Sequence, residues 1–355
     1  MTQEWLNRIA LTIALRNQPK RVRTLFDTYG SATIVMQHHP ELFNRDTLHR
    51  AEQEATFIQQ HSIQTYFYQD DQYPYRLAQC VDAPLILYSK GNVNVNPKHA
   101  VSIVGTRRPS ENGKDWCRRF VLDLAQQLPN LTIISGLAYG IDIVAHKAAI
   151  EAGIPTLIIP AHGLDRIYPA PHRNVAIAAL GQGGILTEYP HLTEPERYNF
   201  VARNRIIAGL ADAVVVVESK EKGGSLITAQ MAQDYSRDVF ALPGRHNDET
   251  AAGCNRLIQQ NRAHLITCAK DLILAMRWEQ DHKTPVQTTI NELLLNLNDY
   301  QQTLLQKLRS SDDGWHINQL VIEAQLPYNT VASELMMLEI EGLVRSLPGG
   351  IWRAI

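Results

Sequence analysis

Glycine and small polar residues gather at three points of the sequence, each directly after a short apolar run. Glycine allows a backbone to approach a ligand closely, and each group leads into a helix-like stretch whose first N–H groups have no partner within the helix. Those N–H groups and the positive end of a helix favour an anion such as phosphate. The groups, which together predict an oxyanion-binding edge, are Gly105-Thr106-Arg107-Arg108, Ser135-Gly136-Leu137-Ala138-Tyr139-Gly140 and Gly223-Gly224-Ser225.

Arginine accompanies these glycine groups. The first group contains an arginine pair, and further arginines fall in segments that we expect to be loops at the same edge. Arg166 and Arg173 follow the third apolar run, and Arg203-Asn204-Arg205 precedes a helix-like stretch. A tight strand-to-helix turn also uses glycine, so any one group alone could be a turn without a ligand. Three groups at the same edge, one of them with paired arginines, favour the anion site.

Two common phosphate-binding motifs are missing. The dinucleotide fingerprint G-x-G-x-x-G is absent after the first run, which continues as GTRRPS, and no acidic residue ends the second run. Gly113-Lys114 is followed by Asp115 where a Walker A loop needs serine or threonine. The cysteines lie far apart without metal-ligand spacing. The sequence therefore predicts no cofactor and no metal.

Catalytic interpretations rest on few residues. Asp142 and His146 lie four apart on one helix face and could form a catalytic or metal-binding pair. The structural interpretation is that Asp142 stabilises the helix start and that His146 hydrogen-bonds beneath the glycine turn. An enzyme acting on a nucleotide, of the phosphoribohydrolase type, needs a carboxylate at the reacting carbon. Glu218, which precedes the third glycine group, is the best candidate for it.

The elements that must position these residues are short apolar runs alternating with helix-like stretches. Most runs are continuously apolar, as in strands covered on both faces. Strand–helix–strand repetition predicts an α/β fold with a Rossmann-like parallel sheet and helices on both faces. The runs span residues 100–105, 131–136, 154–160, 184–189, 212–219 and 238–244.

Different patterns flank this core. Residues 1–85 show helical spacing of apolar residues, and residues 86–276 form the predicted core. Residues 277–289 are polar and aperiodic, which predicts a linker. In residues 290–355 we expect helices over 291–309, 316–325 and 329–341, then a Pro-Gly-Gly hairpin, which is the outline of a winged helix.

Composition narrows the choice of partners. The 355 residues carry a net charge of −2 and are 45% apolar, which predicts two or three folded domains. A polyanion must therefore meet a local basic cluster rather than bulk positive charge. No apolar run is long enough for a membrane span, and the N-terminus lacks the pattern of a signal peptide. The expected location is the cytoplasm, without membrane contact.

Five blocks of sequence carry a resemblance to a known family. They resemble, in this order, the motif series of the DNA-processing DprA (Smf) family, and they cover about residues 98–267. The blocks are VSIVGTRRPSENG, IISGLAYGIDIVAHKAAI, AHGLDRIYPAPH, FVARNRIIAGLADAVVVVES and GGSLITAQMAQDYSRDVFALPG.

The resemblance implies a non-enzymatic protein that binds single-stranded DNA and acts as a homodimer. It implies that the protein protects incoming DNA and helps load RecA recombinase in natural transformation and homologous recombination. It also implies a helical domain of the SAM or helix-hairpin-helix type at the N-terminus. Arg107 would hold a backbone phosphate and Arg173 a second one, with the glycine turns, Asn204 and Arg205 around the same pocket. Tyr139 stands where the family often has small or basic residues, and we expect it to stack on a base.

The predicted winged helix is acidic. Residues 311–355 contain two basic residues, Arg345 and Arg353, and six acidic ones. Three of those acids fall in the predicted recognition helix, which has no lysine or arginine. Duplex phosphates would be repelled there, so we expect a protein-contact or architectural role for this domain.

Overall fold

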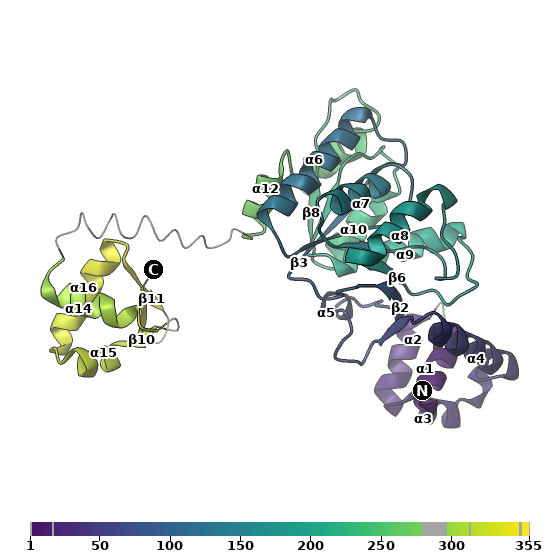
Figure 1. The fold of residues 1–355 in the computed structure, drawn as a ribbon, viewed down its shortest axis with the longest axis horizontal. Helices are drawn as coiled ribbons and strands as arrows, with labels where there is room; N and C mark the ends of the chain where they lie inside the picture. Colours follow the sequence, from purple (N-terminus) through teal and green to yellow (C-terminus); the bar gives the residue numbers. More distant parts are fainter. Residues whose placement is uncertain (1, 16–17, 279–296, 312–313, 348–349, 355) are drawn as a thin grey trace. The chain divides into compact units, whose positions relative to one another are not determined.

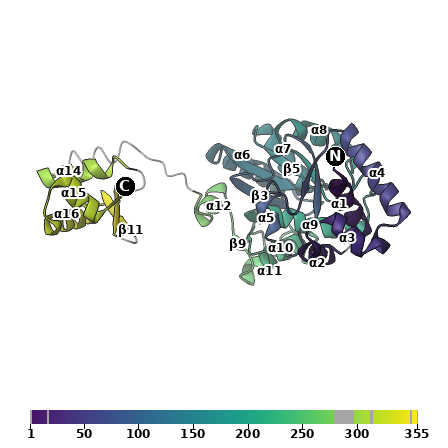
Figure 2. The same ribbon diagram turned by 90° about the horizontal axis from the view of Figure 1, so that it is seen from below.

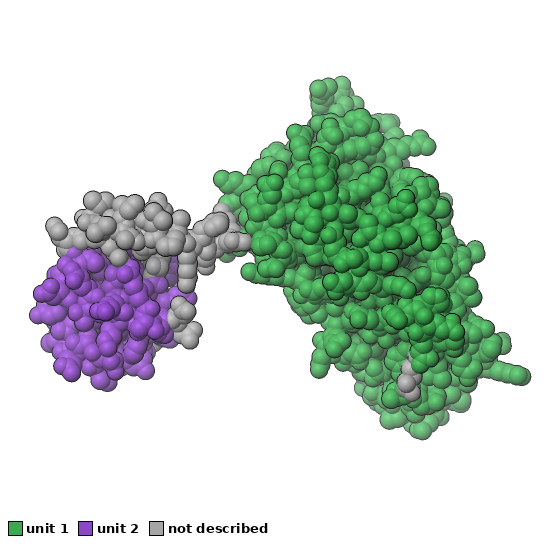
Figure 3. Space-filling view, viewed as in Figure 1, with its two compact units in different colours: residues 1–278 green, residues 279–355 purple. Residues whose placement is uncertain are grey.

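The computed structural model describes residues 2–15, 18–278, 297–311, 314–347 and 350–354. The chain divides into two compact units, residues 1–278 and residues 279–355 (Figure 3). Each unit has its own apolar core.

The first unit is organised around one mixed sheet (Figure 1). Within the described residues its nine strands run in the order β1-β2-β6-β5-β4-β3-β7-β8-β9. All pairs from β6 to β9 are parallel, which confirms the six predicted runs as strands. The strands are β1 (Gln64–Phe67), β2 (Ile86–Gly91), β3 (His99–Val104), β4 (Leu131–Ser135), β5 (Thr156–Ile158), β6 (Gly184–Thr187), β7 (Ala213–Val216), β8 (Asp238–Ala241) and β9 (His264–Leu265).

The antiparallel part of the sheet was not predicted. β1 lies in the segment expected to be helical, and β2 joins it to β6 in antiparallel register. Adjacent residues of a strand face opposite sides of a sheet. Tyr66 of β1 therefore packs into the main core and Phe67 into the core of the helical segment. Because both of its faces are buried, this segment forms a strand. The spacing of its apolar residues alone does not distinguish a strand from a helix.

Helices cover both faces of the sheet (Figures 1 and 2). Residues of α6, α7 and α12 contribute to one core cluster, and residues of α9, α10 and α11 to the other. The elements are α5 (Tyr75–Ala78), α6 (Glu111–Gln127), α7 (Ile141–Glu151), η2 (Ala170–His172), α8 (Arg173–Gln182), α9 (Arg197–Leu210), α10 (Ser225–Asp234), α11 (Ala252–Gln259) and α12 (Ala269–Ala275).

Two predicted loops are helical instead. Arg173 is the first residue of α8, and both Arg203 and Arg205 lie inside α9, which begins at Arg197. The polar residues before Ile206 concealed this longer helix, because half of its surface faces outward at the edge of the sheet. The consequence for the arginines is that helical phase, rather than loop geometry, decides where each one points.

A small helical layer precedes the sheet. It consists of α1 (Gln3–Ala14), α2 (Pro19–Tyr29), α3 (Ala32–His38), η1 (Pro40–Leu42) and α4 (Arg45–Gln60). Its apolar side packs against β1 and β2, with Phe26 and Phe67 ring centroids 4.9 Å apart. These helices therefore rest on the antiparallel edge of the sheet rather than on the parallel strands.

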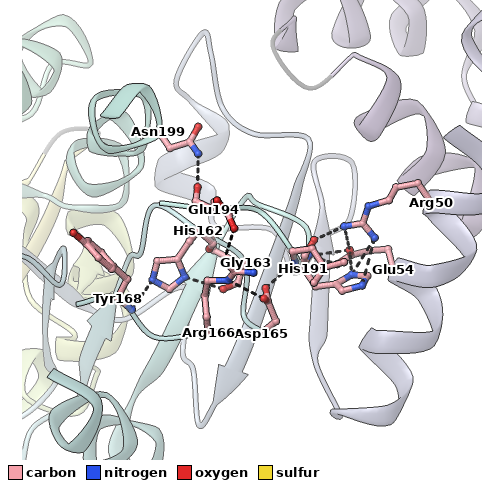
Figure 4. Close-up of polar contacts among 12 residues, drawn as sticks. Arg50, Glu54, His162, Gly163, Asp165, Arg166, Tyr168, His191, Glu194 and Asn199 are labelled. Carbon is pink, nitrogen blue, oxygen red and sulfur yellow. Dashed lines mark hydrogen bonds and ion pairs between the residues drawn. The ribbon is translucent and has the colours of Figure 1, made fainter. Parts of the chain in front are cut away.

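A polar contact joins this layer to the loop after β6 (Figure 4). Glu54 of α4 is buried, and its Oε2 lies 2.5 Å from Nδ1 of His191 and accepts the His191 backbone N–H at 2.9 Å. Arg50 donates to the His191 carbonyl. Burial raises the pKa of Glu54 to about 7, while the nearby Arg50 charge lowers it, and burial lowers the pKa of His191.

This contact predicts a pH dependence of stability. The unfolded Glu54 carboxyl ionises near its ordinary pKa of 4.5, whereas the folded one keeps its proton to about 7. We expect the free energy of unfolding of the wild type, relative to Glu54→Gln, to fall as pH rises between those values. Urea titrations across this range measure it, with the exposed Glu52→Gln of the same helix as control. Parallel wild-type and Glu54→Gln profiles would contradict this assignment.

The second unit has the order of a winged helix. Its described elements are α14 (Asp299–Leu308), β10 (Trp315–His316), α15 (Ile317–Ala324), α16 (Tyr328–Ile340), β11 (Val344–Leu347) and β12 (Ile351–Ala354). β11 and β12 pair antiparallel, which confirms the expected hairpin. The predicted linker beyond Trp278, and the start of the helix expected over 291–309, lie outside the described residues.

Candidate nucleic-acid interface

The three glycine groups lie at the carboxyl ends of three neighbouring strands. They follow β4, β3 and β7, which are adjacent in the sheet. From β3 the chain proceeds to β4 on one side, while β7 and β8 lie on the other, so a topological switch point falls between β3 and β7. Ligands of open α/β sheets bind at such points. The sequence groups therefore converge on the place where this fold binds ligands.

Backbone hydrogen bonds hold the three turns together. The Thr106 N–H donates to the Glu218 carbonyl at 2.7 Å, and the Ile141 N–H donates to the Thr106 carbonyl at 3.3 Å. Gly140 has a φ of +84°, and a Cβ there would collide with the Thr106 carbonyl. Glycine is thus required at position 140 both for its conformation and for the close approach of two turns.

A cavity of about 330 Å³ opens between these turns and α9. Of the predicted site residues, seven line it: Gly105, Thr106, Arg107, Asn204, Gly223, Gly224 and Ser225. We call this the switch-point cavity. Its lining also includes Arg203, from the arginine segment expected at this edge, and two lysines that the sequence analysis did not place there, Lys220 and Lys222, against one carboxylate, Asp142. Positive charge is therefore concentrated at this cavity although the whole chain is slightly negative.

Arg107 is an exposed cation of the cavity, as are Lys220 and Lys222. Arg107 forms no ion pair with any residue in the described part of the chain. Its guanidinium carbon lies 5.5 Å from the ring centroid of Phe200, and that of Arg203 lies 6.0 Å from the same ring. Phe200 lines the cavity and was missed by the sequence analysis. Its place among the basic residues of FVARNR was the available signal, since aromatic and cationic residues interleave in nucleic-acid sites.

Beneath the cavity lies a buried pair of opposite charges. Asp142 and Arg203 are both buried, and both side chains border Gly136. A Cβ on Gly136 would collide with Oδ2 of Asp142 and lie 2.8 Å from both Arg203 Nη atoms. Burial raises the pKa of Asp142, and the Arg203 charge opposes that rise. Burial likewise lowers the pKa of Arg203, opposed by Asp142. Arg203 also donates to the Ile159 carbonyl. The opposite charges of the two side chains thus compensate each other, and together they form the floor of the site.

His146 has a structural position. Its Nε2 lies 2.6 Å from the Gly136 carbonyl and its Nδ1 lies 2.7 Å from Oγ1 of Thr156. Burial lowers its pKa to about 4, so the ring is neutral at pH 7. This confirms the expectation that His146 supports the glycine turn from beneath. Ser135 is also fully buried, and its hydroxyl donates to the Ile103 carbonyl at 2.6 Å.

Several predicted phosphate contacts do not line the switch-point cavity. Arg205 donates to the Asp82 carbonyl at 2.6 Å and pairs with Glu188, beside a separate cavity of about 590 Å³. Arg108 and Arg173 are exposed outside the cavity lining. Ser135 and Gly136 lie beneath it, and Tyr139 is half exposed with its ring 4.7 Å from that of His172. Their roles in binding remain predictions.

Glu218 is engaged elsewhere. Its Oε2 accepts the Ser110 N–H at 2.9 Å and its Oε1 accepts the Ser110 hydroxyl at 2.5 Å, at the start of α6. A Cβ on Gly113 would lie 2.5 Å from the same carboxylate. Its side chain is not part of the cavity lining. Glu218 therefore stabilises a helix N-terminus. This role is structural, whereas the enzyme hypothesis requires the same carboxylate for catalysis.

Two further properties of the described residues bear on function. They contain no group of three or more histidine, cysteine, aspartate or glutamate side chains that could hold a metal ion. None of the helices in the described ranges combines the length and the apolar character needed to cross a bilayer.

The fold and the cavity define a class of protein: a Rossmann-like core with a cationic pocket at its switch point, joined to a winged helix. The chain belongs to the DNA recombination-mediator protein A family, the DprA (Smf) family, whose family model matches residues 64–277. A second family model, the DprA winged helix domain, matches residues 292–350. This membership confirms the resemblance found in the sequence.

Two relatives agree with this assignment. The chain is 34% identical over 310 residues to Protein Smf of Synechocystis sp., covering 79% of this chain and 77% of that protein. It is 39% identical over 204 residues to the DNA processing protein DprA of Streptococcus pneumoniae, covering 58% and 71% of the two chains.

Two solved structures are similar to the chain. That of DprA from Streptococcus pneumoniae has a TM-score of 0.58 at 35% identity and covers 65% of this chain and 82% of that one. The DNA processing protein A of Helicobacter pylori, described for its single-stranded DNA binding mode, has a TM-score of 0.54 at 31% identity and covers 60% and 95%.

Proposed function

We propose that the first unit binds single-stranded DNA by holding its sugar-phosphate backbone in the switch-point cavity. The observation that carries the proposal is the position of Arg107, an exposed guanidinium without an ion-pair partner among the described residues, at the mouth of a cavity lined by backbone turns. Guanidinium and backbone N–H groups are the donors that bind phosphate best. The Helicobacter pylori relative supports the choice of a single strand.

Phe200 extends this proposal to the bases. Its ring lines the cavity and lies close to Arg107 and Arg203. A base that stacks on an aromatic ring beside a held phosphate is bound regardless of its identity, because every base presents a π-face. In duplex DNA the bases are already stacked within the helix. Phe200 therefore favours single strands over duplexes and contributes little sequence preference.

The finer role rests on family membership. We propose that the protein protects incoming DNA, helps load RecA recombinase during natural transformation, and acts as a homodimer without catalysing a reaction. Engagement of Glu218 by Ser110 argues against the alternative of a nucleotide-processing enzyme, because that carboxylate was its best candidate for catalysis.

A titration tests the binding mode. Fluorescence anisotropy with labelled oligo-dT and with a duplex of equal length should give tighter binding of the single strand. The logarithm of the association constant should fall with the logarithm of salt concentration at a slope of about −0.7 per phosphate neutralised. The Phe200→Leu variant should show a smaller difference in affinity between oligo-dT and the duplex than the wild type. Ile177→Leu, on the exposed side of α8, is the control and should behave like the wild type. Salt-insensitive binding, or equal affinity for both ligands, would refute the proposal.

A further inference from the structure

The winged-helix unit carries an apolar surface that its own core does not use. Met336, Met337 and Ile340, at the end of α16, are 61%, 48% and 75% exposed. Residues three and four apart share one face of a helix, so the three side chains form a single patch. Leu335 and Leu338 of the same helix are buried in the core. α16 is thus apolar on its outer side as well, and we call the exposed patch the methionine face.

The charged side chains of the helix that carries the methionine face have one sign. α15 and α16 contain no lysine or arginine, and α16 holds Glu334 and Glu339, with Glu341 directly after it. The C-terminal end of a helix also carries a partial negative charge, and the patch lies at that end. Backbone dipole and side chains therefore both favour a cationic partner.

This electrostatic character excludes the usual ligand of the corresponding helix. In DNA-binding winged helices and helix-turn-helix proteins, the recognition helix enters the major groove between two rows of phosphates. Here that helix would bring glutamates and no cation to the phosphates. Exposed methionine, by contrast, is flexible and polarisable, and it adapts to the side chains of a partner protein. Protein contact explains the residues of α16, whereas duplex binding does not.

We propose that the methionine face binds an amphipathic helix of a partner protein, one whose apolar stripe is flanked by lysine or arginine. The apolar stripe would cover Met336, Met337 and Ile340, as in other complexes where a helix lies in an apolar groove. The cationic flanks would face Glu334 and the negative C-terminal end of α16 and would determine orientation and association rate. This inference is independent of the switch-point cavity, because it concerns only the second unit.

A model peptide tests the proposal with the full chain. The probe is a fluorescent peptide with leucine and lysine at helical spacing, and its counterpart has glutamate in place of lysine. The lysine peptide should bind the wild type and bind Met336→Lys/Ile340→Lys about tenfold or more weakly, because charge repulsion and lost apolar contact act together. Met336→Ser/Ile340→Ser, which adds no charge, should also weaken binding. Gln306→Lys on the exposed side of α14 is the matched control and should bind like the wild type.

Hydrogen exchange locates the contact. The lysine peptide should slow amide exchange over residues 328–340 in the wild type and not in the double-lysine variant. Equal binding of the lysine and glutamate peptides, or unchanged binding by both double variants, would overturn the proposal. So would slowed exchange in α16 on addition of duplex DNA, because that result would identify a nucleic acid as its ligand.

Discussion

Replacing Arg107 with alanine should weaken oligo-dT binding by about 1–3 kcal/mol, which is roughly 5- to 150-fold. The reason is that Arg107 is the exposed guanidinium at the switch-point cavity and has no ion-pair partner among the described residues to release. A phosphate held there exists in every sequence, so the loss should be nearly equal for oligo-dT and for mixed-sequence oligonucleotides. Anisotropy titrations at fixed salt measure the effect, and the salt slope should become shallower by about 0.7.

Arg108→Ala is the matched control for this variant. Arg108 is the next residue in the chain and is exposed, but it does not line the cavity. The sequence predicts phosphate contacts for both arginines, whereas the structure separates them. We expect a smaller loss for Arg108→Ala than for Arg107→Ala. Equal losses would mean that the strand follows the whole basic turn, and an unchanged affinity of Arg107→Ala would refute the cavity as the binding site.

Replacing Arg203 with methionine should lower the free energy of unfolding by about 3–5 kcal/mol, because it leaves the carboxylate of Asp142 buried without its compensating charge. Arg203 is 4% exposed and Asp142 is 8% exposed, so water cannot replace the lost partner. The Ile159 carbonyl also loses a donor. Urea denaturation measures this loss. The dependence of the unfolding free energy on urea concentration should be the same for the variant and the wild type.

A double variant separates charge compensation from packing. Arg203→Met/Asp142→Asn removes both charges, and its loss should be smaller than the sum of the two single losses, because the buried charge is gone. Arg118→Met breaks the exposed pair with Glu151 and should change stability little, since solvent screens such pairs. Additive losses of the two single variants would show that Arg203 and Asp142 do not compensate each other.

The fold of the core could be predicted largely from local patterns. Short, mostly apolar runs such as residues 131–135 of β4 are typical of strands that are buried on both faces, and their alternation with helical stretches indicates parallel crossovers. β1 could not be predicted in this way. Its strand character depends on burial of Tyr66 and Phe67 against two different cores, which no window of neighbouring residues contains.

The candidate site was predicted in part. Arg107 and the glycine turns were recognisable because their residue types have few other uses after an apolar run. Phe200 was not recognised from its place in FVARNR, because an aromatic residue in an amphipathic helix is usually part of a core. Its role depends on the arrangement of β3 beside α9, which brings its ring within 5.5 Å of the Arg107 guanidinium carbon.

The sequence by itself determined which chemistry this protein offers: backbone turns, arginines and an acidic, apolar terminal helix. Only the tertiary structure decided which of these groups meet. Arg203 and Arg205 are two residues apart on α9, and helical phase turns them to different sides, so one reaches the cavity floor and the other pairs with Glu188. Likewise, strand order alone places β3 beside β7 and brings Arg107 to the glycines of residues 223–224. Such contacts arise between distant segments, and local residue patterns do not encode them.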